Sequence, residues 1–126
     1  MIARSRLYRT QPLGPQNQPP FVNACAGLLT RLSPEALLAE LVHIEAAMGK
    51  VAPPMRWGPR LIDLDLLIYA SERRADAGLT LPHPRLHERN FVLYPLADIA
   101  PALVIAGQGR IADLVERVGA QGLSLL

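Results

Sequence analysis

Apolar side chains recur along the chain with two spacings, and each spacing predicts a different kind of element. The 3.6-residue period of a helix relates Leu37, Leu41, Ile44 and Met48, with Leu38 and Val42 beside them. We expect this helix to begin at Ser33-Pro34-Glu35, where a capping residue precedes a proline and an acid, and to end at Gly49. His43 and Glu45 lie off the apolar stripe, and we interpret His43 as solvent-facing.

Alternation with period two and short apolar runs predict the strands. The strongest signal covers Leu61–Tyr69, and weaker ones cover residues 2–10, the apolar run Phe21–Leu29, Leu79–Leu81 and residues 102–105. Prolines predict loops at residues 11–20 and 50–55, and residues 70–78 read as a polar turn. Further helices are predicted at residues 85–99, where Pro95 is expected to kink or break the helix, and at 110–118. Because helices and strands do not alternate regularly, the pattern favours an α+β fold.

Composition narrows the class of protein. The chain has 126 residues, of which 50% are hydrophobic, so we expect one globular domain spanning residues 1–126. Cys25 is the only cysteine, which excludes a disulfide scaffold and indicates a packed thiol. No apolar run reaches the roughly 18 residues of a membrane helix, and the first residues lack an apolar signal core, so a cytoplasmic location is expected.

Charge is weak evidence about partners. The net charge is +2 and the pI is about 9.1, which invites a nucleic-acid interpretation. However, the sequence contains no basic run and no aromatic residues interleaved with arginine. A nucleic-acid-binding module is therefore the least favoured alternative.

Two carboxylates within the predicted strand carry the strongest chemical signal. Period-two geometry places Asp63 and Asp65 on one face, with Cα atoms about 6.6 Å apart, where they would repel each other unless cations neutralised them. Such oxygen ligands suit Mg²⁺ held together with substrate phosphates. The alternative is a half-exposed strand whose outer face happens to be acidic.

Basic residues surround the acidic pair in the sequence. Arg56 and Arg60 precede it, and His83, Arg85 and Arg89 follow it. Metal-binding acids accompanied by phosphate-binding arginines are typical of phosphoryl transfer, and a structural salt-bridge network is the rival interpretation. No P-loop pattern is present.

Aromatic residues near this segment indicate a planar ligand. Trp57 and Phe91 could stack on a flat heterocycle, and Asn23 could read its polar edge. The alternative for Trp57 is an aromatic side chain that caps the core.

Several segments together resemble one enzyme family. Residues 56–67, Arg-Trp-Gly-Pro-Arg-Leu-Ile-Asp-Leu-Asp-Leu-Leu, closely resemble the signature of 6-hydroxymethyl-7,8-dihydropterin pyrophosphokinase, which moves pyrophosphate from ATP to a pterin alcohol and releases AMP in folate biosynthesis. The likeness continues in residues 5–10, in Pro12–Pro15, in Gln18-Pro19, in Phe21–Ala24, in Leu81–Arg85 and in Arg89–Leu93. It implies a ferredoxin-like antiparallel sheet with helices packed on it.

The resemblance also implies roles for individual residues. It assigns the pterin to Thr10, Leu13, Phe21, Asn23, Trp57 and Phe91. It assigns the nucleotide to Glu45, Arg56, Arg60, Leu66, Thr80, His83 and Arg89. Asp63 and Asp65 would bind two Mg²⁺ ions, and they would be catalytic together with Lys50 and Arg60.

Two departures from the family pattern lead to an alternative. Met1 stands just ahead of Ser5, so the family's N-terminal strand and helix are expected to be missing, which would expose a sheet edge. Residues 52–55 lack a second basic residue that is often found in the family's mobile loop. The alternative is a truncated, weak or inactive homologue that still binds pterin or nucleotide, or that acts through a partner. The resemblance implies a monomer, whereas the exposed edge would allow this chain to associate.

Overall fold

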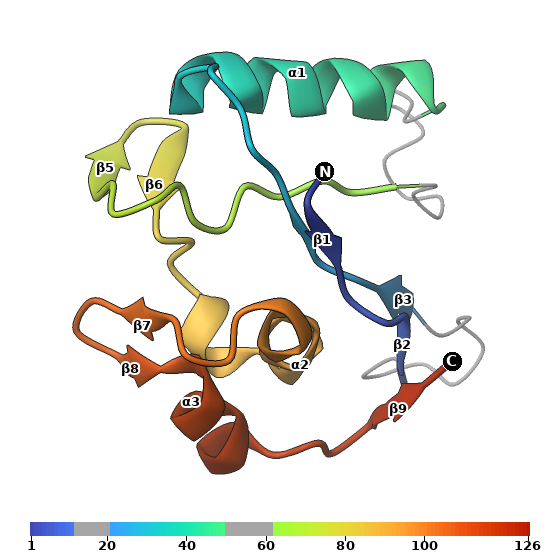
Figure 1. Cartoon of the computed structure of the whole chain (residues 1–126). Coiled ribbons are helices and arrows are strands. Elements are labelled where there is room, and N and C mark those ends of the chain that lie inside the picture. The colour runs from blue at the N-terminus through green and yellow to red at the C-terminus, as the bar shows by residue number, and fades with distance from the viewer. Residues whose placement is uncertain (12–20, 50–61) are drawn as a thin grey trace. The chain divides into compact units, whose positions relative to one another are not determined.

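The computed structural model describes residues 1–11, 21–49 and 62–126 (Figure 1). They cluster into two compact units, Met1–Leu29 with Pro84–Leu126, and Thr30–His83, called unit 1 and unit 2 below. In the part of the chain that the structure describes, unit 1 combines helices with several antiparallel strand pairs and unit 2 combines one helix with one such pair, which confirms the predicted α+β class. Among the described residues, none of the helices is both long and apolar enough to cross a bilayer.

Unit 1 contains three small sheets. The strands β3 (Phe21–Asn23), β2 (Tyr8–Thr10) and β9 (Leu123–Leu125) form one antiparallel sheet with β2 in the centre. A second sheet pairs β1 (Ala3–Arg4) with β4 (Ala26–Gly27), and a hairpin pairs β7 (Val104–Ile105) with β8 (Gly109–Arg110). The predicted strand at residues 102–105 is confirmed in its second half, whereas β8 and β9 were not predicted.

A β-bulge divides the first strand and its partner. Ala3 pairs with Gly27 and Tyr8 with Asn23, and the amide of Ser5 donates to the carbonyl of Cys25 at 2.8 Å. Between these pairs, Arg6 and Leu7 of one strand face only Ala24 of the other, so the pairing breaks and restarts.

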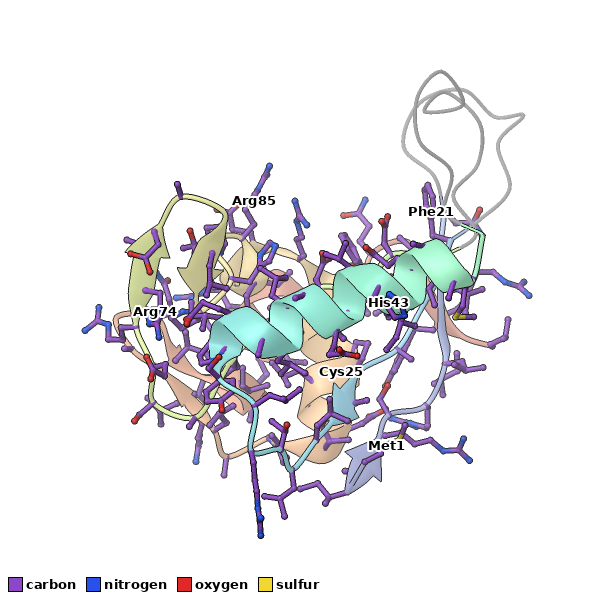
Figure 2. The ribbon with its side chains drawn as sticks, turned by 90° about the horizontal axis from the view of Figure 1, so that it is seen from above. Met1, Phe21, Cys25, His43, Arg74 and Arg85 are labelled. Carbon is purple, nitrogen blue, oxygen red and sulfur yellow. The ribbon has the colours of Figure 1, made fainter. Side chains whose placement is uncertain are left out.

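The expectation of one buried strand over Phe21–Leu29 is therefore wrong. The bulge splits the segment into two short strands with different partners. Its apolar side chains are also largely exposed: Phe21 is 58% and Leu29 is 83% exposed. The thiol of Cys25, between the two strands (Figure 2), is packed as expected, and burial raises its pKa.

The core of unit 1 lies between its helices. A 3-10 turn, η2 (Leu86–Glu88), leads into α2 (Asn90–Ile99), and α3 (Ile111–Val118) packs against α2. The fully buried side chains are Leu86, Leu93, Pro95, Ile111 and Leu114. The helix predicted over residues 85–99 is divided into η2 and α2, and α2 continues through the buried Pro95 to Ile99 without a break.

A carboxylate on α2 binds the bulge. The backbone amide of Arg6 donates to Oδ2 of Asp98 at 3.1 Å, and the guanidinium of Arg6 donates at 2.8 and 3.1 Å. The phenol of Tyr8, a residue that is only 4% exposed, donates to both carboxylate oxygens at 2.9 Å. These bonds, above all those from Arg6, hold the pKa of Asp98 below its usual range.

Unit 2 begins with the predicted helix. Ser33 caps α1 (Pro34–Ala47) by accepting a hydrogen bond from Ala36 N at 3.1 Å, and Gly49 adopts φ 97° just beyond the helix. The apolar stripe is only partly buried: Leu37 is 8% exposed, but Ile44 and Met48 are 41% and 55% exposed. His43 is exposed, as predicted (Figure 2).

A hairpin follows where only a turn was predicted. β5 (Arg74–Asp76) pairs with β6 (Leu79–Leu81) through a turn in which Gly78 has φ 85°. The guanidinium of Arg74 (Figure 2) pairs with Glu35 at the start of α1, with Glu72 at 3.0 Å and with Asp76 at 3.4 Å. The predicted extended segment Leu79–Leu81 is confirmed, whereas the turn at residues 70–78 is confirmed only in part.

The strongest strand prediction is wrong over the part that the structure describes, because residues 62–69 form no strand. A strand requires a neighbour for its backbone groups. Here the amide of Leu64 instead donates to Oε2 of Glu45 at 2.7 Å, and the carbonyl of Leu67 accepts from the amide of His83 at 2.8 Å. Tertiary hydrogen bonds thus replace the expected ladder.

The lowered pKa of Asp98 predicts a pH-dependent contribution to stability. A carboxyl group whose pKa is depressed by folding stabilises the native state above its unfolded pKa, near 3.9, and loses this contribution as the pH falls through the folded pKa. We expect Asp98→Asn to be less stable than the parent at neutral pH, with a difference that shrinks in acid. Urea unfolding over a pH series measures this difference, and a difference that stays constant into acid would contradict the assignment.

Candidate functional site

Four side chains share one face of the strand pair β2–β3 in unit 1. Tyr8 and Thr10 are two residues apart on β2, and they lie opposite Asn23 and Phe21 on β3. Residues two apart and residues directly paired across a ladder project to the same side of a sheet. Because the Tyr8 phenol reaches Asp98 on α2, this face is turned toward α2, the helix that carries Phe91. Of the residues that the resemblance assigns to the pterin, Thr10, Phe21 and Asn23 share this face, and Phe91 lies on the helix that the face is turned toward.

The hydroxyl of Thr10 is the unusual polar atom of this face. Its Oγ1 is buried and has no hydrogen-bond partner among the described residues. An unsatisfied buried polar group costs about 1–3 kcal/mol, so proteins rarely leave one without a reason. A ligand edge that approaches β2 would supply the missing partner.

Phe91 and Arg89 are coupled at the start of α2. The guanidinium carbon of Arg89 lies 5.7 Å from the centroid of the Phe91 ring, within cation–π range. Arg85 pairs instead with Glu88, at 3.5 Å. The salt-bridge interpretation therefore fits Arg85, whereas Arg89 lies over an aromatic ring.

The acidic pair lies in unit 2. Asp63 and Asp65 are both exposed, while Ile62, Leu64 and Leu66 between and beside them are partly buried. The alternation predicted from sequence therefore holds, although the segment is not a strand. Both carboxylates lie on the exposed side of the segment, where a hydrated cation can reach them.

Glu45 holds this acidic segment. It is 7% exposed, and its carboxylate accepts a hydrogen bond from the amide of Leu64, the residue between the two aspartates. A charged acceptor makes a short, strong bond to a backbone amide. The side chain that lay off the apolar stripe in the sequence is thus a buried anchor.

The remaining nucleotide candidates of unit 2 occupy its hairpin and the residues that follow it. Thr80 is exposed on β6, and His83 is half-buried with its amide bonded to the carbonyl of Leu67. Within the described ranges, no cluster of three or more His, Cys, Asp or Glu side chains could hold a metal. Mg²⁺ needs no such cluster, since one or two carboxylates with substrate phosphates and water suffice.

Five expected site residues lie outside the described residues: Leu13, Lys50, Arg56, Trp57 and Arg60. Their roles stay predictions. Sequence reasoning also missed one group, Arg6, Tyr8 and Asp98, because its members are separated by up to 92 positions and no periodicity connects them. The β-bulge was also not predicted, because the pattern of apolar and polar residues does not indicate it.

Comparison with known proteins decides the family. The family model for 7,8-dihydro-6-hydroxymethylpterin-pyrophosphokinase matches residues 1–101. The chain belongs to this family. Pyrophosphokinase activity in folate biosynthesis, the function and enzyme class expected from the sequence, is thereby confirmed.

Three bacterial relatives show how similar this chain is to other pyrophosphokinases. The 2-amino-4-hydroxy-6-hydroxymethyldihydropteridine pyrophosphokinase of Pseudomonas aeruginosa is 41% identical over 126 residues, which are 100% of this chain and 77% of that protein. The protein of the same name from Haemophilus influenzae is 44% identical over 93% of this chain and 72% of its own length. The one from Methylorubrum extorquens is 49% identical over 86% and 68%.

The buried Glu45, which holds the acidic segment of this pyrophosphokinase, leads to a prediction about stability. Glu45→Gln keeps an acceptor for the Leu64 amide but removes the charge, so we expect a loss of about 1 kcal/mol, the difference between a charged and a neutral hydrogen bond. Glu40→Gln, an exposed change on the same helix, should stay within about 0.5 kcal/mol of the parent. Denaturant unfolding measures both variants, and equal effects would contradict the anchoring role.

Proposed function

We propose that, within the pyrophosphokinase activity, the face shared by β2 and β3 binds 6-hydroxymethyl-7,8-dihydropterin and the Asp63–Asp65 segment binds magnesium for ATP. The net reaction forms a bond from the pterin hydroxyl oxygen to the β-phosphorus of ATP, breaks the bond from that phosphorus to the α–β bridging oxygen, and releases AMP and a proton. The observation that carries the proposal is the buried hydroxyl of Thr10, which has no hydrogen-bond partner among the described residues, on a face that also presents Phe21 and Asn23.

The pterin face combines hydrogen-bonding groups with aromatic surface. Thr10 and Asn23 would bond the polar edge of the ring, together with the backbone near Leu13. Phe21 and Phe91 would pack on its faces, and Trp57 is proposed to join them. The 58% exposure of Phe21 supports this role, because an aromatic side chain left in water gains by covering a flat ligand.

The Asp63–Asp65 segment fits Mg²⁺ by its donor set. Both groups offer carboxylate oxygens on one exposed side of a segment whose backbone is held by Glu45. Two ions are expected from the family likeness. When bound, Mg²⁺ neutralises phosphate charge and polarises the reacting phosphoryl group. The protein's own part is to hold the two carboxylates at a fixed spacing.

Basic and polar residues would bind the nucleotide. Arg89 and His83 are proposed to contact phosphates, as are Arg56 and Arg60, and Lys50 would add charge near the reacting centre. Glu45, Leu66 and Thr80 are proposed for the adenosine side. The bond from Leu64 N to Glu45 supports a role for Glu45 in shaping the nucleotide segment.

Other expectations stay predictions. They comprise a ferredoxin-like arrangement, a single domain, a monomer or an edge-mediated assembly, a cytoplasmic location and, as the alternative function, a weak or inactive homologue. The shared face of β2 and β3 favours the active enzyme, since it retains the groups that a pterin needs.

The metal assignment predicts loss of turnover in Asp65→Asn. Removal of one carboxylate charge at the reacting phosphates should lower kcat by about 100-fold to 1,000-fold. The measurement is AMP release from ATP, with dependence on Mg²⁺ and on the pterin alcohol checked separately. Asp113→Asn, an exposed change on α3, serves as the control and should behave like the parent. Parent-like rates in Asp65→Asn would overturn the assignment.

The Thr10 hydroxyl predicts opposite effects on stability and binding. Thr10→Val replaces a hydroxyl that has no partner among the described residues by a methyl group of the same shape, so the free protein should be as stable as the parent or slightly more stable. The same change should weaken pterin binding by about 1 kcal/mol, roughly fivefold. Thermal unfolding and pterin titration test both effects, and destabilisation without weaker binding would contradict the proposal.

A further inference from the structure

We propose that Arg6, Tyr8 and Asp98 form a positioning cluster that sets the pterin-binding face of β2 and β3 relative to Phe91 on α2. This inference rests on the proposed function, since it explains how that face is held. None of the three residues is expected to touch the pterin. Their effect would pass through the strand and the helix that they join.

The cluster lies at the bulge, where Arg6 and Leu7 face the single residue Ala24. The amide of Arg6 donates outside the sheet, to Oδ2 of Asp98 at 3.1 Å. A bulge reorients the strand that follows it, and here the strand that follows is β2, which carries Thr10.

Asp98 also accepts hydrogen bonds from two side chains at the bulge, those of Arg6 and Tyr8. The Arg6 guanidinium donates from Nε and from its terminal nitrogen, at 3.1 and 2.8 Å, and the Tyr8 phenol donates at 2.9 Å. Arg6 also donates to the phenol oxygen of Tyr8 at 3.0 Å. One carboxylate therefore ties together a backbone amide, a cation and a phenol, so the geometry of all three is fixed by one residue of α2.

The position of Asp98 on its helix links the cluster to Phe91. The two residues are seven positions apart, and seven steps of about 100° return to within about 20° of the same face, about 10.5 Å along the axis. A rotation of α2 about its axis would move both side chains together. The ring of Tyr94, at 6.4 Å from that of Tyr8 and edge-on to it, adds a second contact between β2 and α2.

Tyr8→Phe with Tyr94→Phe as a matched control tests the cluster. The first removes the phenol that bonds Asp98, and the second removes a phenol on the same pair of packed rings that forms no such bond. Steady-state kinetics with 6-hydroxymethyl-7,8-dihydropterin and ATP, at a temperature where every variant is folded, give the KM for each substrate. We expect Tyr8→Phe to raise the KM for the pterin about tenfold and to leave the KM for ATP within twofold, whereas Tyr94→Phe leaves both unchanged.

Asp98→Asn and the double variant with Tyr8→Phe extend the test. If the two residues act as one cluster, the double variant should raise the pterin KM no more than about twofold beyond the larger single effect. An unchanged pterin KM in Tyr8→Phe, or equal rises in both KM values, would overturn the positioning role.

Thr10→Val and Asn23→Ala separate the two levels of the proposal. If these variants raise the KM for the pterin and Tyr8→Phe does not, only the positioning cluster is wrong. If neither of them raises it, the proposed pterin face is wrong, and the role of the cluster is overturned with it.

Discussion

The arrangement of unit 1 depends on a backbone amide that is bonded outside its sheet. The Arg6 amide lies at the bulge, and an unbonded amide there would cost about as much as a lost hydrogen bond. Asp98 supplies the acceptor for this amide from α2. The same bond that satisfies the amide also fixes the strand against the helix, so a local irregularity determines how the candidate pterin face is built.

In unit 2, a carboxylate likewise accepts a hydrogen bond from the amide of an irregular segment. The amide of Leu64 belongs to a segment without a ladder partner among the described residues, and the buried carboxylate of Glu45 accepts its hydrogen bond. In both units a carboxylate on a helix holds an irregular backbone segment, and in both the segment leads directly into residues proposed for substrate or metal. A charged acceptor suits this task because its bond to an amide is stronger than that of a neutral group.

Sequence patterns predicted those features that local chemistry determines. Ser33 and Gly49 bound α1 as expected, because capping depends on neighbours three or four residues away. Alternation alone predicted that Asp63 and Asp65 share one face, and both are exposed. The strand over residues 62–69 was not correct, since pairing depends on a partner that periodicity cannot supply. The contact of Asp98 with Arg6 spans 92 positions, and nothing local encodes it.

The features that sequence patterns missed are those on which the proposed site depends. A continuous ladder from Ala3 to Thr10 would lack the bulge at which Arg6 and Tyr8 bond Asp98. A regular strand at residues 62–69 could bond the Leu64 amide to a neighbouring strand instead of to Glu45. Each irregularity places a backbone amide on a charged carboxylate of another element, and such a bond is at least as strong as the sheet hydrogen bond it replaces. The gain is a more precisely fixed arrangement of the site residues, because a tertiary hydrogen bond joins elements that are distant in the chain. The unpartnered Thr10 hydroxyl is the one group for which no such exchange is made within the described residues. That difference fits the proposal that a bound ligand meets the Thr10 hydroxyl.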